Sequence, residues 1–297
     1  MCDYEQRLNA AKEVILDADY ILIGGGSGLS AAAGLTYSGK RFTDNFADFI
    51  EKYGLEDMYA ASFYPFKTDE ELWAHWARHI DVNRFSQPAT QLYRDLLVLV
   101  QDKQYFVLTT NVESQFAKAG FPQEKIFATQ GDYAYLQCAK GCHDKLCYNE
   151  DLVKQMLRET HNCQIPTTLV PKCPVCGEAM DVNLRHNEFF VQDEAWYEAA
   201  KHYETFLKKS TGKRIVYLEL GVGFNTPTII RFPFEQMTYQ NPKATLVRIN
   251  KDYPKGAKEN VTRTVAFDED MAKITEHLLE ENHARHLEPM ARLCKVQ

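Results

Sequence analysis

Residues 20–34, YILIGGGSGLSAAAG, decide the fold of this chain. The first four, 20–23, are apolar or aromatic and long enough for a buried parallel strand. Glycines at positions 24, 25, 26 and 28 then allow a sharp turn and a close approach of the backbone to a ligand. We expect a helix to begin within residues 30–33, so that the N–H groups of its first turn face the glycines. A strand, a glycine turn and a helix start in this order predict a cradle for a pyrophosphate.

The common dinucleotide fingerprint, G-x-G-x-x-G, is not completed in this stretch. Leu29 and Ala31 stand where the third glycine would fall, counted from Gly24 and Gly26 respectively. This weakens the interpretation of the chain as an ordinary nicotinamide-dependent dehydrogenase. A glycine-rich turn without any ligand remains the alternative from these residues alone.

Length and composition narrow the class of protein. With 297 residues, 45% of them hydrophobic, the chain can bury a substantial core. The net charge of -7 argues against general binding to nucleic acid or to an anionic membrane. No apolar run approaches the roughly 20 residues of a membrane span, and no signal peptide is recognisable, so we expect a soluble cytoplasmic protein.

Helices and strands alternate along the rest of the chain. Apolar residues at helical spacing predict helices within residues 4–18, 36–54, 69–80, 88–100, 194–210 and 268–289. Short apolar runs predict strands at 105–108, 125–127, 214–220, 244–249 and 261–266. This alternation indicates a doubly wound α/β fold with a parallel sheet, interrupted by a cysteine-bearing insertion.

Polar residues follow several of these strands. Thr109, Thr110, Asn111 and Glu113 come after the strand at 105–108, and the segment TQGD, which includes Gln130, comes after 125–127. Ligands of open parallel sheets bind beyond the carboxyl ends of the strands, so these side chains fall where chemistry is expected. A second glycine turn, GVGFNT at 221–226, follows another buried strand and suits the other half of a dinucleotide site. A single polar loop residue can equally serve as a cap or turn.

The cysteines are grouped in metal-site spacing. Cys138-x3-Cys142 precedes Cys173-x2-Cys176, which lies in the segment PKCPVCGEAM typical of a zinc knuckle. Two such pairs predict a closed, structural zinc site of four thiolates. Spacing alone leaves open whether one of the intervening candidates replaces a ligand: Cys147, Cys163, His143 or His161. Free core cysteines are the alternative.

Taken together, several motifs in one order make the sequence similar to the sirtuin family of NAD-consuming enzymes. They are GSGLSAAAGL at 26–35, TTNVE at 109–113, TQGD at 129–132, both cysteine pairs, LELGVGFNT at 218–226 and RIN at 248–250. The resemblance covers nearly the whole chain. It implies a Rossmann-like domain of residues 1–136 and 185–297 with a helical insertion at about 40–85, and a zinc module at 137–184. NAD, the implied cosubstrate, would lie in the cleft between them.

The resemblance also implies which residues hold NAD. The pyrophosphate would lie at the helix start, the adenosine half near the second glycine turn, and the nicotinamide ribose opposite Asn111 and Gln130. The expected set is Gly26, Ser27, Gly28, Leu29, Ser30, Thr110, Asn111, Glu113, Gln130, Gly221, Val222, Gly223, Asn225, Thr226 and Asn250.

Two departures from the family pattern alter the expected chemistry. Most sirtuins carry proline, aspartate, phenylalanine and arginine where this chain has TYSG at 36–39, and a catalytic histidine where it has Gln130. A glutamine amide has no accessible pKa, so it can hydrogen-bond but cannot take up a proton. Asn111, which supports cleavage of the glycosidic bond in the family, is retained. Asn111 and Gln130 are therefore the expected catalytic residues for transfer of ADP-ribose without the base used in deacetylation.

This combination, with the aromatic segment at 61–81, resembles the macrodomain-linked (class M) branch of microbial sirtuins. That branch implies mono-ADP-ribosylation of a lipoylated carrier protein of the glycine cleavage H type. It also implies a macrodomain hydrolase that reverses the mark and a role in oxidative stress. The alternatives are an NAD-dependent protein-lysine deacylase and a non-catalytic module that senses NAD.

Overall fold

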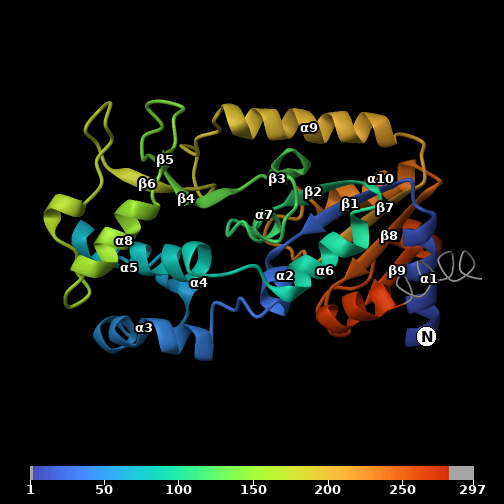
Figure 1. Cartoon of the computed structure of the whole chain (residues 1–297), viewed down its shortest axis with the longest axis horizontal. Helices are drawn as coiled ribbons and strands as arrows, with labels where there is room; N and C mark the ends of the chain where they lie inside the picture. Colours follow the sequence, from blue (N-terminus) through green and yellow to red (C-terminus); the bar gives the residue numbers. More distant parts are fainter. Residues whose placement is uncertain (1–2, 281–297) are drawn as a thin grey trace, which may run out of the picture.

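Six parallel strands form the larger sheet of the computed structural model, which describes residues 3–280 (Figure 1). The strands are β1 (Tyr20–Gly25), β2 (Gln104–Thr109), β3 (Ile126–Ala128), β7 (Ile215–Leu220), β8 (Ala244–Ile249) and β9 (Thr264–Phe267). Their order is β3-β2-β1-β7-β8-β9, so the chain runs outward in one direction through β2 and β3 and in the other through β8 and β9. The order reverses between β1 and β7, which makes the carboxyl ends of these two strands the switch point where ligands bind in such sheets.

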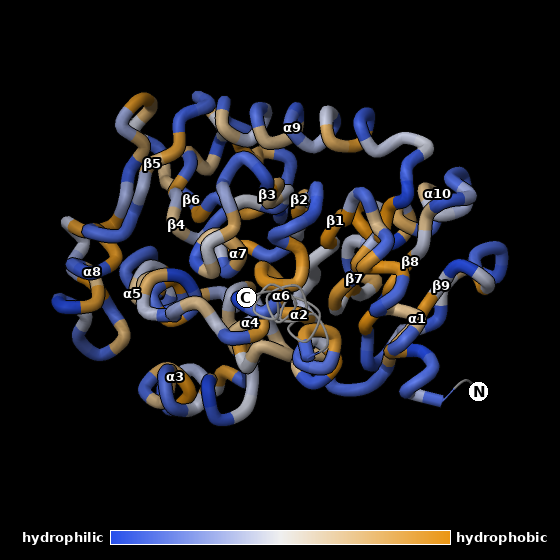
Figure 2. The backbone as a smooth tube through the Cα atoms, turned by 45° about the vertical axis from the view of Figure 1, so that its right-hand side comes forward, coloured by the Kyte–Doolittle hydropathy of each residue, from blue (hydrophilic) through white to orange (hydrophobic). Residues whose placement is uncertain are grey.

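Helices cover both faces of this sheet, because its strands are apolar on both sides. One face packs against α1 (Tyr4–Asp17), α6 (Gln91–Val100) and a last helix that begins at Met271. The other face packs against α9 (Glu194–Ser210) and α10 (Arg231–Gln240). Hydrophobic residues are concentrated in the strands of this sheet (Figure 2). The doubly wound α/β fold expected from the sequence is therefore confirmed.

A second unit lies at one end of the large sheet (Figure 1). Its antiparallel sheet, in the order β5-β4-β6, consists of β4 (Gly131–Cys138), β5 (Cys147–Tyr148) and β6 (Met180–Leu184). Around it lie α3 (Lys40–Tyr53), α4 (Met58–Ala61), α5 (Asp69–Ile80), a π-helical turn (Asp81–Phe85) and α8 (Glu150–Glu159). Residues from 42–85 and from 133–184 share one hydrophobic cluster, so the helical insertion and the cysteine segment pack as one body.

Some expected boundaries are wrong. Helix α2 (Ser27–Ala32) begins three residues before the expected start at Ser30. The later start was expected because glycine is a poor helix former, yet Gly28 is helical. The strand expected at 261–266 is β9 at Thr264–Phe267, and Val261 lies in a 3-10 helix (Lys258–Arg263), where it is 72% exposed. Residues 281–289 of the expected terminal helix lie outside the described residues.

The remaining short elements are α7 (Gln115–Lys118) and the 3-10 turns Gln123–Lys125 and Thr167–Leu169. The expected limit of the cysteine module at residues 136 and 137 falls inside β4. Within residues 3–280, no helix combines the length and the apolar character that crossing a bilayer requires.

Candidate active site

Two glycine turns pack against each other at the switch point. Gly28 N–H donates to the Gly221 carbonyl at 2.9 Å, and Gly221 N–H donates to Ile249 at 2.9 Å. A Cβ at Gly26 would lie 2.7 Å from the Gly221 oxygen. A Cβ at Gly221, where φ is +60°, would lie 2.2 Å from the Leu29 nitrogen. No side chain fits between the turns, so these glycines are required for the close packing of the two backbones.

Two cavities flank the start of α2. One, of about 540 Å³, is lined by the second glycine turn and by residues after β8 and β9, including Asn250, Asp252 and Asp268. The other, of about 470 Å³, is lined by residues 35–38 and 110–113 and by Tyr59 and Asn225. Ser27, Gly28 and Ala31 line both cavities. An elongated ligand could therefore pass over the start of α2 and occupy both.

Ten of the residues expected to contact the cofactor line one of these cavities: Ser27, Gly28, Ser30, Thr110, Asn111, Glu113, Gly221, Gly223, Asn225 and Asn250. Gly26, Leu29, Val222, Thr226 and Gln130 line neither. Leu29 is fully buried, and the Val222 carbonyl accepts a hydrogen bond from Asn250 Nδ2 at 2.8 Å.

Gln130 lies just after β3, beside the loop that follows β2. Its backbone carbonyl accepts the N–H of Arg185 at 3.0 Å. None of the hydrogen bonds recorded across residues 3–280 involves its side-chain amide. A third cavity of about 240 Å³ reaches Asn111 and Glu113 together with Gly131, the neighbour of Gln130. The backbone of Gln130 is therefore close to the site.

Asn111 is held by hydrogen bonds that fix the direction of its amide. Nδ2 donates to the Gly26 carbonyl at 3.0 Å, and it lies 3.0 Å from Ser30 Oγ and 3.2 Å from the Tyr93 hydroxyl. A carbonyl can only accept, so the group facing Gly26 must be the NH₂ end of the side chain. Asn111 Oδ1 therefore points away from these partners and is left to accept a hydrogen bond from a ligand.

Glu113 is buried in the same network. Its Oε1 accepts from Ser30 Oγ at 2.5 Å and from the Tyr93 hydroxyl at 3.3 Å, and its Oε2 accepts from Val112 N at 3.0 Å. Burial raises the pKa of Glu113 above its ordinary value, and the hydrogen bonds from Ser30 and the backbone oppose this rise. The result is a carboxyl group held rigidly beside Asn111 at the wall of the cavity.

The segment TYSG at 36–39, just before the helical insertion, supplies another wall. Tyr37 lines the cavity that contains Asn111, and its hydroxyl is 2.8 Å from that of Tyr133 on β4. Tyr133 in turn lies 3.0 Å from Nε2 of the fully buried His79. Burial raises the pKa of Tyr37 to about 12, so its hydroxyl stays protonated. The segment that departs from the sirtuin pattern is therefore anchored to the smaller sheet.

Buried ion pairs shape the loop after Asn250. Arg248 is fully buried and pairs with Glu219 at 2.8 Å, and its Nη1 donates to the Lys255 carbonyl at 2.7 Å. Arg231 donates to the carbonyls of Tyr253 and Lys255 at 3.2 Å. Both arginines thus bind backbone oxygens of the loop that closes the larger cavity.

Tyr93 and Arg231 were not singled out by the sequence analysis, and Arg248 entered it only as part of the motif RIN at 248–250. Tyr93 sits on the apolar face of α6, where a tyrosine differs from its neighbours in needing a hydrogen-bond partner. That need was the available signal. The arginines gave none, because a charged residue inside an apolar strand or helix reveals its partners only in three dimensions.

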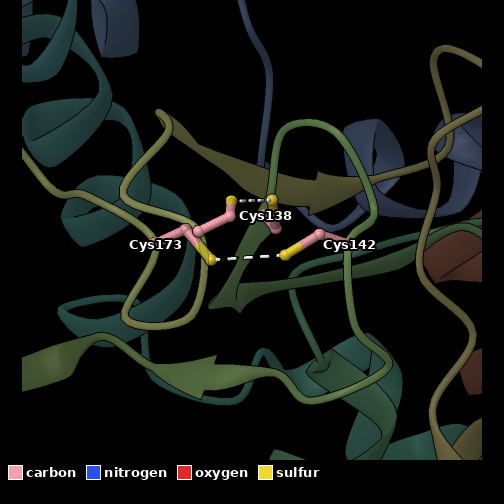
Figure 3. Close-up of side chains that lie close together, drawn as sticks. Cys138, Cys142 and Cys173 are labelled. Atoms are coloured by element: carbon pink, nitrogen blue, oxygen red, sulfur yellow. Dashed lines mark hydrogen bonds between the residues drawn. The ribbon is translucent and has the colours of Figure 1, made fainter.

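The four expected cysteine ligands lie together, and Figure 3 labels three of them, Cys138, Cys142 and Cys173. Cys138 ends β4, Cys142 lies in the turn after it, and Cys173 and Cys176 lie before β6. The Cys138–Cys176 and Cys142–Cys173 sulfur separations are 3.6 Å, and all four sulfurs lie within 4.8 Å of one another. Tetrahedral zinc with bonds of about 2.3 Å needs sulfurs about 3.8 Å apart. The donor set fits a closed zinc site.

The other candidate ligands do not belong to this group. Among the described residues, the cluster that could hold a metal contains neither Cys147 nor Cys163 nor His161. His143 lies beside it, with Nε2 at 3.3 Å from Cys173 Sγ, where it can donate a hydrogen bond to the thiolate.

Comparisons with known proteins add to this geometry. No protein-family model matches the chain. It is 36% identical over 275 residues to a Staphylococcus aureus protein named protein ADP-ribosyltransferase, and the match covers 92% of this chain and 87% of that protein. It is 31% identical to a Fusarium oxysporum protein named probable bifunctional ADP-ribose hydrolase/ADP-ribosyltransferase. That match covers 82% of this chain but 42% of the longer protein.

Solved structures resemble the fold as a whole. A Sir2 homologue–NAD complex has a TM-score of 0.55 at 14% identity, and the match covers 94% of each chain. At this identity the likeness concerns the fold.

Proposed function

The chain belongs to the sirtuin family of protein ADP-ribosyltransferases, and from this premise we propose how its cavities serve the reaction. It is an NAD-dependent enzyme that transfers ADP-ribose to a protein acceptor. The observation that carries the proposal is the pair of cavities that meet at the start of α2, one of which ends at Asn111 and Glu113.

NAD would lie across both cavities. The adenosine half would occupy the larger cavity between the second glycine turn and Asn250, and the pyrophosphate would cross Ser27 and Gly28. The nicotinamide ribose would then lie in the second cavity, opposite Asn111. This arrangement uses the residues that line both cavities as the bridge between the two halves of the dinucleotide.

NAD bound across these cavities would supply an anomeric carbon whose bond to nicotinamide can break with positive charge developing on the ribose. Asn111 Oδ1 is free to accept a hydrogen bond from a ribose hydroxyl, because its NH₂ group is already used by the protein. Glu113, when ionised, places a negative charge next to this site, which favours the charged transition state. Gln130 would orient the acceptor or the ribose by hydrogen bonding, since an amide cannot remove a proton.

We further propose that the acceptor is a lipoylated carrier protein of the glycine cleavage H type and that a macrodomain hydrolase reverses the modification. The sequence resemblance supports both, and the name of the Fusarium relative joins a hydrolase with a transferase in one protein. Zinc bound by Cys138, Cys142, Cys173 and Cys176 would be structural, because four thiolates leave no open coordination position.

Mass spectrometry of lipoylated and unlipoylated carrier protein after incubation with the enzyme and NAD tests this function. We expect ADP-ribose on the lipoylated carrier and release of nicotinamide. Replacing Asn111 by alanine removes hydrogen bonds worth about 1.5–3 kcal/mol, so Asn111→Ala should lower transfer tenfold or more. Asn9→Ala, on the exposed face of α1, is the matched control.

Full transfer by Asn111→Ala would contradict the assignment of this residue. An acyl-lysine peptide in place of the carrier separates the deacylase alternative, because a deacylase would form O-acyl-ADP-ribose. NAD binding without any nicotinamide release would favour the non-catalytic sensor.

A further inference from the structure

We propose that Tyr93 is a positioning residue for ADP-ribosyl transfer, whose buried hydroxyl orients Asn111 and Glu113 toward the cavity. This inference rests on the proposed function of that cavity. Tyr93 lines none of the three cavities described above, so it does not touch a ligand and acts only through its neighbours.

The position of the hydroxyl is set by the core. Tyr93 has no exposed surface, and its ring packs edge-on against Phe116 at a centroid distance of 4.8 Å. The helix that carries it, α6, belongs to the main hydrophobic cluster of the large sheet. The hydroxyl lies 2.9 Å from Ser30 Oγ, 3.2 Å from Asn111 Nδ2 and 3.3 Å from Glu113 Oε1. One rigid group therefore contacts all three polar side chains of the network.

A count of hydrogens shows what the hydroxyl contributes. Asn111 has two N–H bonds and three acceptors within reach, namely the Gly26 carbonyl, Ser30 Oγ and the Tyr93 oxygen. Ser30 and Tyr93 have one hydrogen each, and both lie beside the Glu113 carboxylate. Tyr93 can accept from the amide while it donates toward the carboxylate. Its removal deletes an acceptor for Asn111 and a donor for Glu113 together.

Other groups act on Glu113 at longer range. Among the described residues, the cations Arg41 and Lys118 and the hydroxyl groups of Tyr37 and Tyr133 interact with it electrostatically. None of these four side chains is hydrogen-bonded to the carboxylate within residues 3–280. Tyr93 and Ser30 are the side chains that donate to it. Loss of a donor disfavours the ionised form, so Glu113 should ionise at higher pH without the Tyr93 hydroxyl.

Tyr93→Phe is the direct test, because it keeps the ring and its packing and removes only the hydroxyl. Tyr105→Phe is the matched control, since Tyr105 is buried in the same cluster and its hydroxyl is outside the network. We expect Tyr93→Phe to lower kcat about fivefold to tenfold with KM for NAD changed less than twofold. The acidic limb of its pH profile should move to higher pH. Tyr105→Phe should match the wild type in all three.

A double-mutant cycle separates positioning from general damage to the fold. In the Asn111→Ala background, Tyr93→Phe should cost clearly less than in the wild type, because part of its effect passes through Asn111. An equal loss in both backgrounds overturns the proposal, and so does a Tyr93→Phe enzyme with the kcat and pH profile of the wild type. Wild-type protein that releases no nicotinamide from NAD overturns the proposed function itself, and this inference with it.

Discussion

His75, on α5, makes the helical insertion sensitive to acid. It is fully buried, and neither of its ring nitrogens has a hydrogen-bond partner in the described part of the chain. Phe46, Phe49, Phe66 and Trp76 surround it, with ring centroids 5.3 to 5.9 Å away. Burial among these rings lowers the pKa of His75 to about 3, since the site cannot solvate an imidazolium.

The direction and size of the pH effect on stability follow from the pKa values of His75 in the folded and in the unfolded chain. The unfolded chain binds a proton at about pH 6.5, whereas folded His75 binds one only near pH 3. Between these values the unfolded state holds more protons, so stability falls as the pH is lowered. From pH 7 to pH 5 the loss amounts to about 2 kcal/mol for this one side chain. His79, whose pKa is also lowered by burial, acts in the same direction.

His75→Leu removes the titrating group and its unpaired nitrogens while nearly preserving its volume. The variant should be at least as stable as the wild type at pH 7, and its advantage should grow by about 2 kcal/mol at pH 5. Urea unfolding at both pH values, followed by tryptophan fluorescence, measures this difference. His202→Leu, at an exposed position on α9, is the control. If the advantage of His75→Leu is the same at both pH values, the reasoning about its buried imidazole is wrong.

Two further substitutions test the metal site and the buried ion pairs. Cys173→Ser should abolish stoichiometric zinc binding, measured by metal analysis of the purified protein. The control Cys147→Ser should retain zinc. Zinc retained by Cys173→Ser would refute the ligand set. Glu219→Gln should lower the free energy of unfolding by about 3–5 kcal/mol, because it leaves two buried arginines, Arg248 and Arg231, with Glu235 as the carboxylate close to both. The exposed Glu198→Gln should change it little, and equal urea midpoints for the two glutamine variants would contradict this account.

The parallel sheet could be predicted from the sequence, because its strands are continuous apolar runs that are separated by polar or glycine-containing segments. Helix α5 could be read equally well, since its apolar spacing is regular and Thr68 caps its start by accepting from Glu71 N–H. The start of α2 could not be predicted from the sequence, because a glycine at position 28 indicates a turn, whereas the backbone there is helical. The strands of the smaller sheet were also missed, since β5 has two residues and β4 is irregular in register against β6.

The sequence predicted the loops that form the site but not the hydrogen-bond network between their side chains. Asn111 and Glu113 were found because they follow a buried strand, and strand ends meet at one edge of a sheet. Tyr93 contacts both from a helix that precedes that strand, and only packing brings it there. The glycines were expected to admit a ligand, whereas a Cβ at Gly24 or Gly25 would strike the side chains of α10 and α7. Close packing that depends on distant segments leaves no local pattern in the chain.

The cysteine cluster lies outside the cavities, yet it is structurally continuous with one of their walls. Cys138 is the last residue of β4, and Tyr133 lies on the same strand and holds the hydroxyl of Tyr37. Cys138, Cys173 and Tyr133 also share one hydrophobic cluster. A metal held by the four cysteines would tie the end of β4 to the loop before β6, and it would therefore restrain the strand on which the Tyr37 wall depends. In this way a closed metal site with no chemistry of its own would support the geometry around Asn111.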